Sequence, residues 1–342
     1  MSFKIVNTLN IPGKSQGEEK LKSADIEYIK GMWNTEEELI ANCAGADAVM
    51  GDLIRKPFVR KVIESFSPNC RILAGIGLGF DKVDLEAATE KGIVVTNVPD
   101  YCLDEVSGRA IALMLALAYK IIPLNEGVKA GKLADANSPN PVQKIMGPVY
   151  RTRGLTLGLI GCSKIGTATA LKARGLGMRV VAYDPYLFDG ALESLGIEPV
   201  DMETLLKESD FVSMHVPSNA ETKGLLGYEQ LKKMKKTAFV INTARGAVID
   251  EPALVKALQE GLIAGAGLDV TVKEPVDTTN PLTQMPNVIL TGHSAWFSLD
   301  ADGELFFKKP ISQVLLALKG QWPPYAINPQ VRKKWLEKWA KK

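Results

Sequence analysis

The chain has 342 residues, of which 46% are hydrophobic and 23% charged, with a formal net charge of +2. These values are typical of a globular protein long enough for two domains, and they give no reason to expect a nucleic-acid partner. The four cysteines form no Cys-x-x-Cys pair, which argues against a metal site or a disulfide framework. Since neither a signal core nor a bilayer-spanning apolar run is evident, we expect a cytoplasmic protein without membrane contact.

Short Val- and Ile-rich runs alternate with helical patterns, which is typical of parallel α/β units. In the first hundred residues we predict strands over 3–6, 47–50, 71–74 and 93–96. A long apolar helix over 103–122 and a polar, proline-containing stretch over 135–154 follow. The alternation then resumes, with strands over 156–160, 179–183, 211–214, 238–242, 265–269 and 287–290. This order predicts two separate α/β sheets.

The C-terminal part follows the last predicted strand and can return the chain to the first domain. We predict a helix from about Leu299 to Leu318. In the tail, Val331, Trp335 and Trp339 are spaced four apart and share one helix face. A membrane-surface helix is one reading of this pattern. We expect packing against the protein body or a second subunit instead.

The segment GLIGCSKIG (158–166) lies between a predicted strand and a helical pattern over 164–175. It matches the dinucleotide-binding pattern G-x-G-x-x-G at Gly161 and Gly166, but Ser163 replaces the middle glycine. The serine hydroxyl can donate to a phosphate, or the side chain can crowd its approach. We predict a pyrophosphate site at the helix N-terminus, formed by Gly161, Ser163, Lys164 and Ile165.

The strand after this helix ends in Asp184, eighteen residues beyond Gly166. This is near the spacing of the acid that binds the adenosine ribose hydroxyls in dinucleotide-binding folds. A carboxylate there would repel a 2′-phosphate, and the following YDPYLF segment offers no arginine to bind one. We therefore predict NAD as cofactor, with NADH preferred over NADPH.

Polar residues follow the strands of the second half at their carboxyl ends, where parallel sheets bind ligands. They are His215, Arg245, Asp269 and His293, with Glu274 in the loop between the last two strands. A Glu–His pair can act as a general acid/base, because the carboxylate orients the ring and stabilises the imidazolium. The planar fork of Arg245 suits a carboxylate. Since the chain's only two histidines both lie here, we predict an active site at this edge.

With these residues in view, the chain resembles the D-isomer-specific 2-hydroxyacid dehydrogenase family. The motifs that carry the resemblance are the strand–turn–helix with Asp184 and the segments 75–99, 215–226, 242–258, 265–275 and 292–296. The resemblance implies two Rossmann-like α/β domains. A flavodoxin-like substrate domain would comprise 1–103 and 299–342, and an inserted NAD-binding, doubly wound parallel sheet would comprise 104–298. It also implies a homodimer joined largely through the long helix.

The family's activity implies an NAD-dependent oxidoreductase that interconverts a small 2-oxo acid and its D-2-hydroxy acid. On this resemblance, His293 protonates the carbonyl oxygen as hydride arrives, Glu274 keeps His293 charged, and Arg245 grips the substrate. Backbone N–H groups near Ile76 and Gly77 would complete the carboxylate site. The cofactor would also be lined by His215, Pro217, Thr243, Ala244 and Asp269, with Asp269 at the nicotinamide end.

Three departures from the family's sequence pattern keep other functions open. Besides Ser163, Gly292 stands where a proline often precedes the histidine, and WFS (296–298) resembles a block in the C-terminal-binding-protein corepressors. Because fold does not fix function, an NAD-responsive protein-binding module is the alternative. The complete catalytic set argues against it. Formate-oxidising relatives carry an amide where Glu274 stands, which argues against that activity.

The substrate's side chain is the least determined feature. Tyr101 and Trp296 either wall the pocket or belong to the core. A phosphorylated substrate would require a basic cluster, for which the candidates are Arg71, Lys82 and Arg109.

Overall fold

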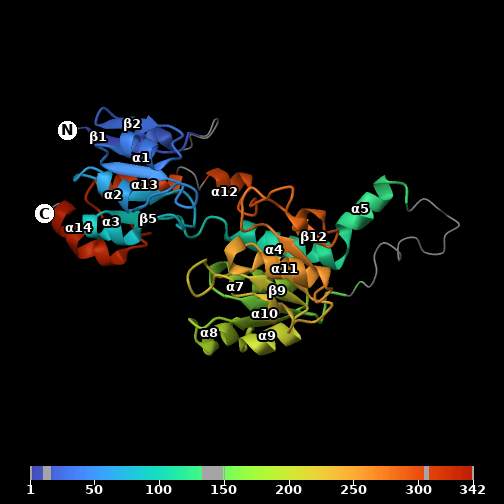
Figure 1. Cartoon of the computed structure of the whole chain (residues 1–342). Helices are drawn as coiled ribbons and strands as arrows, with labels where there is room; N and C mark the ends of the chain where they lie inside the picture. The colour runs from blue at the N-terminus through green and yellow to red at the C-terminus, as the bar shows by residue number, and fades with distance from the viewer. Residues whose placement is uncertain (1, 11–16, 133–148, 150, 304–307, 341–342) are drawn as a thin grey trace. The chain divides into compact units, whose positions relative to one another are not determined.

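The computed structural model describes residues 2–10, 17–132, 149, 151–303 and 308–340. The chain divides into two compact units, of which unit 1 comprises Met1–Tyr101 and Ser298–Lys342 and unit 2 comprises Cys102–Phe297. Each unit contains one parallel sheet with helices around it (Figure 1). The α/β class and the two-sheet architecture predicted from the sequence are confirmed. The predicted polar stretch over 135–154 lies largely outside the described residues, as does the middle of the predicted C-terminal helix.

The sheet of unit 1 has the strand order β2-β1-β3-β4-β5, which is that of flavodoxin-like folds. Its strands are β1 (Phe3–Asn7), β2 (Ile26–Lys30), β3 (Ala48–Gly51), β4 (Ile72–Gly75) and β5 (Val94–Thr96). Its helices are α1 (Glu36–Cys43), α2 (Arg60–Ser65), α3 (Leu85–Lys91), α12 (Leu299–Gly303), α13 (Lys309–Leu318) and α14 (Arg332–Trp339), with short 3-10 turns at Glu18–Leu21 and Pro329–Val331. Strand β2 was not predicted. It is an edge strand without fully buried residues, so its sequence lacks a continuous apolar run.

The C-terminal tail packs against the body of unit 1, as predicted. Trp335 is fully buried, and its indole N–H donates to the carbonyl of Arg71 at 2.8 Å. The Arg71 guanidinium lies over the ring of Trp339, 4.4 Å from its centroid, and donates to the carbonyl of Leu318 at 2.8 Å. Arg71 therefore joins the tail to the sheet, which accounts for its charge without a phosphorylated substrate.

The sheet of unit 2 has the order β12-β11-β10-β9-β6-β7-β8. Its first strand β6 lies in the middle, so the winding direction reverses between β6 and β9, as in doubly wound dinucleotide-binding folds. The strands are β6 (Thr156–Ile160), β7 (Arg179–Tyr183), β8 (Glu198–Pro199), β9 (Phe211–Met214), β10 (Phe239–Asn242), β11 (Gly265–Leu268) and β12 (Val288–Leu290). The helices are α4 (Leu103–Ala118), α5 (Ile121–Lys129), α7 (Lys164–Gly175), α8 (Asp189–Ser194), α9 (Met202–Glu208), α10 (Tyr228–Leu231) and α11 (Glu251–Gln259), with 3-10 turns at Gly246–Val248 and Pro281–Gln284.

The long helix predicted over 103–122 is broken. Helix α4 ends at Ala118, Lys120 has a left-handed backbone with φ of 54°, and α5 begins a new direction at Ile121. Pro123 explains the break, because its ring would clash with the carbonyl of Tyr119 and it has no N–H to donate. Within the described residues no single helix is long and apolar enough to span a membrane; α4 and α5 pass that test only as a pair bent by 59°.

Candidate active site

The carboxyl ends of the central strands in unit 2 lie at one edge of the sheet. Asn242 at the end of β10 is paired with Met214 on β9 and with Leu268 on β11. The end of β6 is likewise level with the end of β9. Because the strands end in register, the loops that follow them start side by side. The sheet therefore brings the predicted residues of unit 2 to a single edge.

The glycine turn after β6 needs glycine at two of its three motif positions. Gly161 has φ of 87°, and a Cβ on it would lie 2.8 Å from the carbonyl oxygen of His215. A Cβ on Gly166 would lie 2.5 Å from the carbonyl oxygen of Gly161. Ser163 instead has an extended backbone with φ of −73° and is exposed. Serine at the middle position therefore costs no backbone strain.

The start of helix α7 fits a pyrophosphate. Among the described residues, the side chain of Ser163 at the N-cap makes no capping hydrogen bond. The first N–H groups of a helix have no partner within it, and its dipole favours an anion there. Asp184 lies against the same turn, since one of its carboxylate oxygens accepts the Cys162 N–H at 2.9 Å. Its other oxygen accepts the Tyr186 N–H at 3.0 Å, so the carboxylate is held at the end of β7.

His215 and the turn after β10 contribute neutral polar groups beside this site. The Nε2 of His215 lies 2.9 Å from the hydroxyl of Ser213. Burial lowers the pKa of His215 to about 4, so the ring is neutral at neutral pH. The hydroxyl of Thr243 is buried without a hydrogen-bond partner among the described residues. A neutral ring and an unsatisfied buried hydroxyl suit a surface that contacts a cofactor.

The turn that carries Arg245 is held by the buried side chain of Asn242. The amide oxygen of Asn242 accepts the Ala244 N–H at 3.0 Å, and its amide nitrogen donates to the carbonyl of Arg245 at 2.8 Å. A Cβ on Gly246 would lie 2.1 Å from the Thr271 carbonyl. Glycine at 246 therefore lets the Arg245 turn pack directly against the loop that carries Glu274. Asn242 and Gly246 were not predicted as site residues, although both lie in the NTARG motif.

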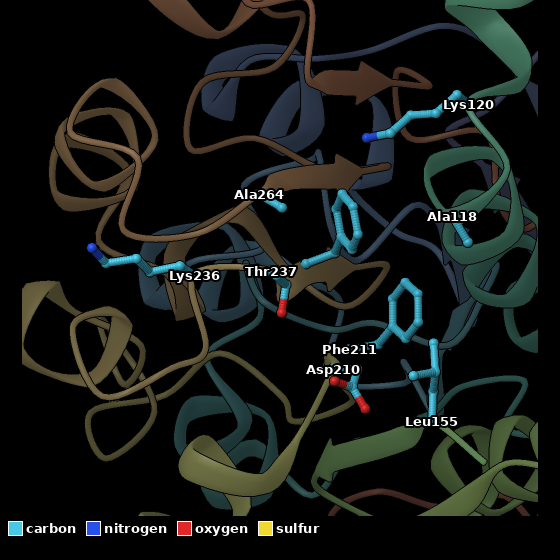
Figure 2. Close-up of a pocket in the computed structure, with 9 residues that line it drawn as sticks. Ala118, Lys120, Leu155, Asp210, Phe211, Lys236, Thr237 and Ala264 are labelled. Carbon is cyan, nitrogen blue, oxygen red and sulfur yellow. The ribbon is translucent and has the colours of Figure 1, made fainter. Parts of the chain in front are cut away.

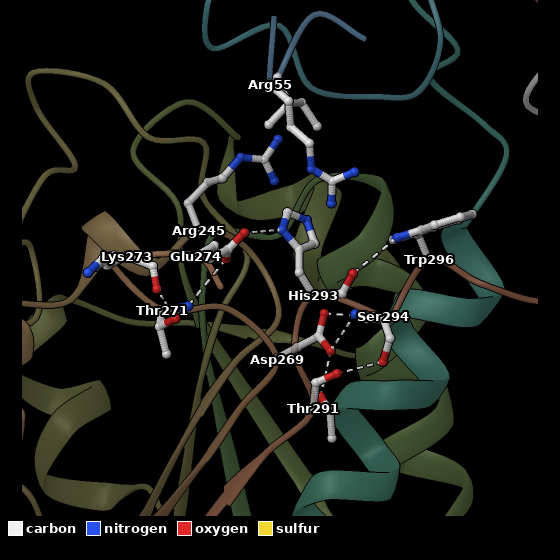
Figure 3. Close-up of polar contacts among 12 residues, drawn as sticks. Arg55, Arg245, Asp269, Thr271, Lys273, Glu274, Thr291, His293, Ser294 and Trp296 are labelled. Atoms are coloured by element: carbon white, nitrogen blue, oxygen red, sulfur yellow. Dashed lines mark hydrogen bonds and ion pairs between the residues drawn. The ribbon is translucent and has the colours of Figure 1, made fainter. Parts of the chain in front are cut away.

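His293 and Glu274, which the sequence predicts to act as an acid/base pair, lie in contact with each other. The Nδ1 of His293 lies 2.6 Å from Oε2 of Glu274, and Oε1 of Glu274 accepts the Thr271 N–H at 3.3 Å. The His293 side chain is 18% exposed. Because Nδ1 faces the carboxylate, Nε2 is the ring nitrogen that can exchange a proton with a substrate. Figure 3 shows the side chain of Arg245 beside this pair.

Gly292 and His293 both have left-handed backbones, with φ of 62° and 56°. Proline is restricted to φ near −65°, so it cannot occupy position 292 in this loop conformation. Gly292 is thus consistent with the local backbone. Trp296 is half-buried, and its indole N–H donates to the carbonyl of His293 at 3.1 Å.

The remaining predicted site residues, Asp269, Ile76, Gly77 and Pro217, make contacts within their own units. Asp269 is buried, and its carboxylate accepts hydrogen bonds from the loop that carries His293. In unit 1, the Ile76 N–H already donates to the carbonyl of Gly51 at 2.9 Å, so this particular donor is not open to a substrate carboxylate. Gly77 has φ of 111°, and a Cβ on it would lie 3.7 Å from the hydroxyl of Tyr101. Pro217 is exposed, and its carbonyl accepts the Thr222 hydroxyl at 2.6 Å.

A cavity of about 450 Å³ lies at the opposite edge of this sheet, where the strands begin (Figure 2). Its residues are Ala118, Lys120, Leu155, Asp210, Phe211, Lys236, Thr237, Phe239 and Ala264. The rings of Phe211 and Phe239 are stacked at 5.5 Å. Asp210 is engaged by the Lys235 ammonium at 2.8 Å and by the Thr156 N–H. This cavity contains none of the predicted catalytic or cofactor-binding residues.

Comparison with known proteins agrees with this geometry. The model of the D-isomer specific 2-hydroxyacid dehydrogenase NAD binding domain matches residues 111–295. A glyoxylate reductase of Korarchaeum cryptofilum is 39% identical over 296 residues, covering 86% of each chain. The chain belongs to the D-isomer specific 2-hydroxyacid dehydrogenase family. It is therefore an NAD-dependent oxidoreductase of 2-oxo and 2-hydroxy acids.

Other family members extend the comparison. A glycerate dehydrogenase of Methylorubrum extorquens is 39% identical over 269 residues, which is 78% of this chain and 81% of that protein. The NAD complexed form of a D-isomer specific 2-hydroxyacid dehydrogenase from Lactobacillus delbrueckii ssp. bulgaricus has a TM-score of 0.76 and 26% identity. That match covers 95% of this chain and the whole of the other. Together these relatives support both the family and the fold.

Proposed function

We propose that this dehydrogenase reduces a small 2-oxo acid to its D-2-hydroxy acid, with NADH as the hydride donor. The observation that carries the proposal is the 2.6 Å contact of His293 with Glu274, next to the turn that holds Arg245. Glyoxylate is the first substrate to test, because several of the similar proteins are named glyoxylate reductases.

In this reaction His293 donates the proton, and Glu274 orients and stabilises the charged histidine ring. The carboxylate of Glu274 fixes the ring through Nδ1 and stabilises the imidazolium, so Nε2 can protonate the substrate carbonyl oxygen. The Arg245 guanidinium binds the substrate carboxylate through its planar fork and neutralises charge that develops on the carbonyl oxygen. NADH, when bound, supplies the hydride. Gly77 is proposed as a further backbone donor to the carboxylate.

The cofactor specificity follows from Asp184. Its carboxylate lies at the end of β7 against the glycine turn, where it can accept the ribose hydroxyls and would repel a 2′-phosphate. We therefore propose that NADH binds more tightly than NADPH. The other residues proposed to contact the cofactor are Gly161, Ser163, Lys164, Ile165, His215, Pro217, Thr243, Ala244 and Asp269.

We assign NAD binding to unit 2 and substrate specificity to unit 1, with functional boundaries at 103/104 and 298/299. The family model for NAD binding matches 111–295, which lies within unit 2. All four cysteines are buried and none of them forms a disulfide in the described residues, which suits a protein of the reducing cytoplasm.

We further propose that the protein is a homodimer. Helix α5 exposes apolar side chains, with Ile121 51%, Ile122 43% and Val128 62% exposed. Such a helix is stabilised when a second copy covers it. Sedimentation at micromolar concentrations would measure the mass, and replacing Ile122 and Val128 by Ser should shift it towards that of one chain. A single-chain mass for the unchanged protein would refute the dimer.

The activity is tested by following NADH absorbance with a panel of 2-oxo acids. The panel contains glyoxylate, hydroxypyruvate, pyruvate, and branched, aromatic and phosphorylated acids, each assayed with NADH and with NADPH. We expect turnover of at least one small acid and a lower KM for NADH than for NADPH. If NADH binds but none of the acids is reduced, the proposed activity is refuted for this substrate class, and the NAD-responsive binding role gains support.

A further inference from the structure

We infer that Asp269 is the positioning residue of His293: its buried side chain and its carbonyl hold the loop 291–295 that presents the imidazole to Glu274. The inference rests on the proposed function, because it assigns a task to a residue of the same site. It gives Asp269 a second role, in addition to the cofactor contact at the nicotinamide end that is proposed above.

The carboxylate of Asp269 is surrounded by donors from one loop. Its Oδ1 accepts the Thr291 hydroxyl at 2.5 Å and the Ser294 N–H at 3.1 Å. Its Oδ2 accepts the Ala295 N–H at 3.0 Å. The residue is only 2% exposed, so these three donors replace the water that its buried carboxyl oxygens would otherwise bind. The side chain of Asp269 is thus directed towards the His293 loop (Figure 3).

The backbone of Asp269 adds a fourth contact. Its carbonyl accepts the N–H of His293 at 2.5 Å. Asp269 therefore binds the histidine's own N–H and also donors on either side of it in the chain, Thr291 and Ser294. The loop needs this support, because His293 has a left-handed backbone, which is unfavourable for a residue with a Cβ. A contact within the loop, from the Ser294 hydroxyl to the carbonyl of Thr291 at 2.7 Å, closes the turn.

The geometry links this loop to catalysis through a single short contact. The His293 Nδ1 lies 2.6 Å from Glu274, whose loop belongs to a different strand connection. If loop 291–295 moved by about 1 Å, that hydrogen bond would be lost and the imidazolium would lose its stabilising charge. Asp269 is therefore expected to act on proton transfer, by way of His293, and to have little effect on cofactor affinity.

The decisive variant is Asp269→Asn, which keeps the shape and replaces one oxygen by an NH₂ group. In either amide orientation, this group faces the N–H of Ser294 or of Ala295, so at least one donor loses its acceptor. We expect kcat to fall by roughly 10- to 100-fold, as for the loss of a charged hydrogen bond, while the Kd of NADH changes less than about twofold.

Thr291 provides a milder variant with a matched control. Thr291→Val keeps the side-chain volume but removes the hydroxyl that donates a hydrogen bond to Asp269, so kcat should fall by about 3- to 10-fold. Thr291→Ser keeps the hydroxyl and should restore most of the activity. This pair tests the inference even if Asp269→Asn does not fold.

A spectroscopic readout separates this inference from the proposed activity. The chain has only two histidines, so ¹⁵N-histidine labelling gives two ring systems. The Nδ1 proton of His293, shared with Glu274, should resonate far downfield in the unchanged protein and shift or broaden in Asp269→Asn. If the unchanged protein reduces no 2-oxo acid, the proposed activity fails, but this signal still tests the positioning.

Two results would overturn the inference. One is a tenfold or larger rise in the Kd of NADH with an unchanged His293 signal, which would mean that Asp269 acts through cofactor binding and not through the histidine. The other is an unchanged kcat and an unchanged signal in both Asp269→Asn and Thr291→Val, which would leave Asp269 without a role in placing the histidine.

Discussion

The two edges of the sheet in unit 2 differ in chemistry although the same strands form both. At the carboxyl edge, strands β9, β10 and β11 lead into His215, Arg245 and Asp269. At the amino edge, β9 and β10 begin with the stacked rings of Phe211 and Phe239 around the 450 Å³ cavity. The carboxylate there, Asp210, is engaged by Lys235 and the backbone.

The comparison teaches that volume alone does not mark the site. The amino edge offers space, but its carboxylate, Asp210, is engaged by structural partners. The carboxyl edge offers a short Glu–His contact, an arginine and a helix N-terminus at which, within the described residues, the Ser163 side chain makes no capping hydrogen bond. We therefore expect changes at the carboxyl edge to alter catalysis and changes at the amino edge to alter stability.

The largest effect is expected at His293. His293→Ala removes the proton donor and should lower kcat by about 10²- to 10⁴-fold, while NADH still binds. Steady-state kinetics with the best 2-oxo acid, together with NADH fluorescence titration, would measure both quantities. Unchanged turnover would remove His293 from the mechanism.

At the amino edge, Phe239→Ala should separate stability from activity. Phe239 is 8% exposed and stacks on Phe211, so its loss should reduce the free energy of unfolding by about 3–5 kcal/mol. Activity per folded molecule should stay within about twofold. Urea unfolding and active-site titration would test this, with Phe239→Leu as the milder control. A large loss of kcat in the folded variant would contradict the division between the edges.

His215 makes stability pH-dependent at the carboxyl edge. Its pKa is about 4 in the folded chain and near 6.5 when unfolded, so below pH 6.5 only the unfolded chain takes up the proton. This linkage should lower the free energy of unfolding by up to about 3 kcal/mol as the pH falls from 6.5 to 4. His215→Asn should lack this part of the pH dependence. Urea unfolding of both proteins across this pH range would test the linkage. If their free energies of unfolding changed equally with pH, the linkage to His215 would be refuted.

The smallest effect is expected at Ser163. Because its backbone is extended, Ser163→Gly should relieve no strain, and the Kd of NADH should stay within about twofold. The free energy of unfolding should fall by about 0.5–1 kcal/mol, since glycine makes the unfolded chain more flexible. NADH titration and thermal unfolding would measure these values. Tenfold weaker binding would instead show that the serine hydroxyl holds a phosphate.

Most strands could be predicted because buried parallel strands form continuous apolar runs with clear boundaries. The run TLGLI became β6 (Thr156–Ile160) with the predicted ends. The edge strand β2 could not be predicted in this way, because half-buried residues give no such run. The apolar pattern over 103–122 predicts one helix, whereas Pro123 directly after it indicates the break between α4 and α5, because proline disrupts the preceding turn.

The α/β class, the glycine turn and the residues that follow each strand can be predicted from the sequence, because they depend on local periodicity and on the edge at which parallel strands end. Which donors and acceptors meet became clear only in the folded chain. It placed Glu274 on His293, directed Asp269 to the histidine loop and engaged the Ile76 N–H with Gly51. Such hydrogen bonds require loop positions that are correct to within a few tenths of an ångström. These positions arise from packing between segments far apart in the chain.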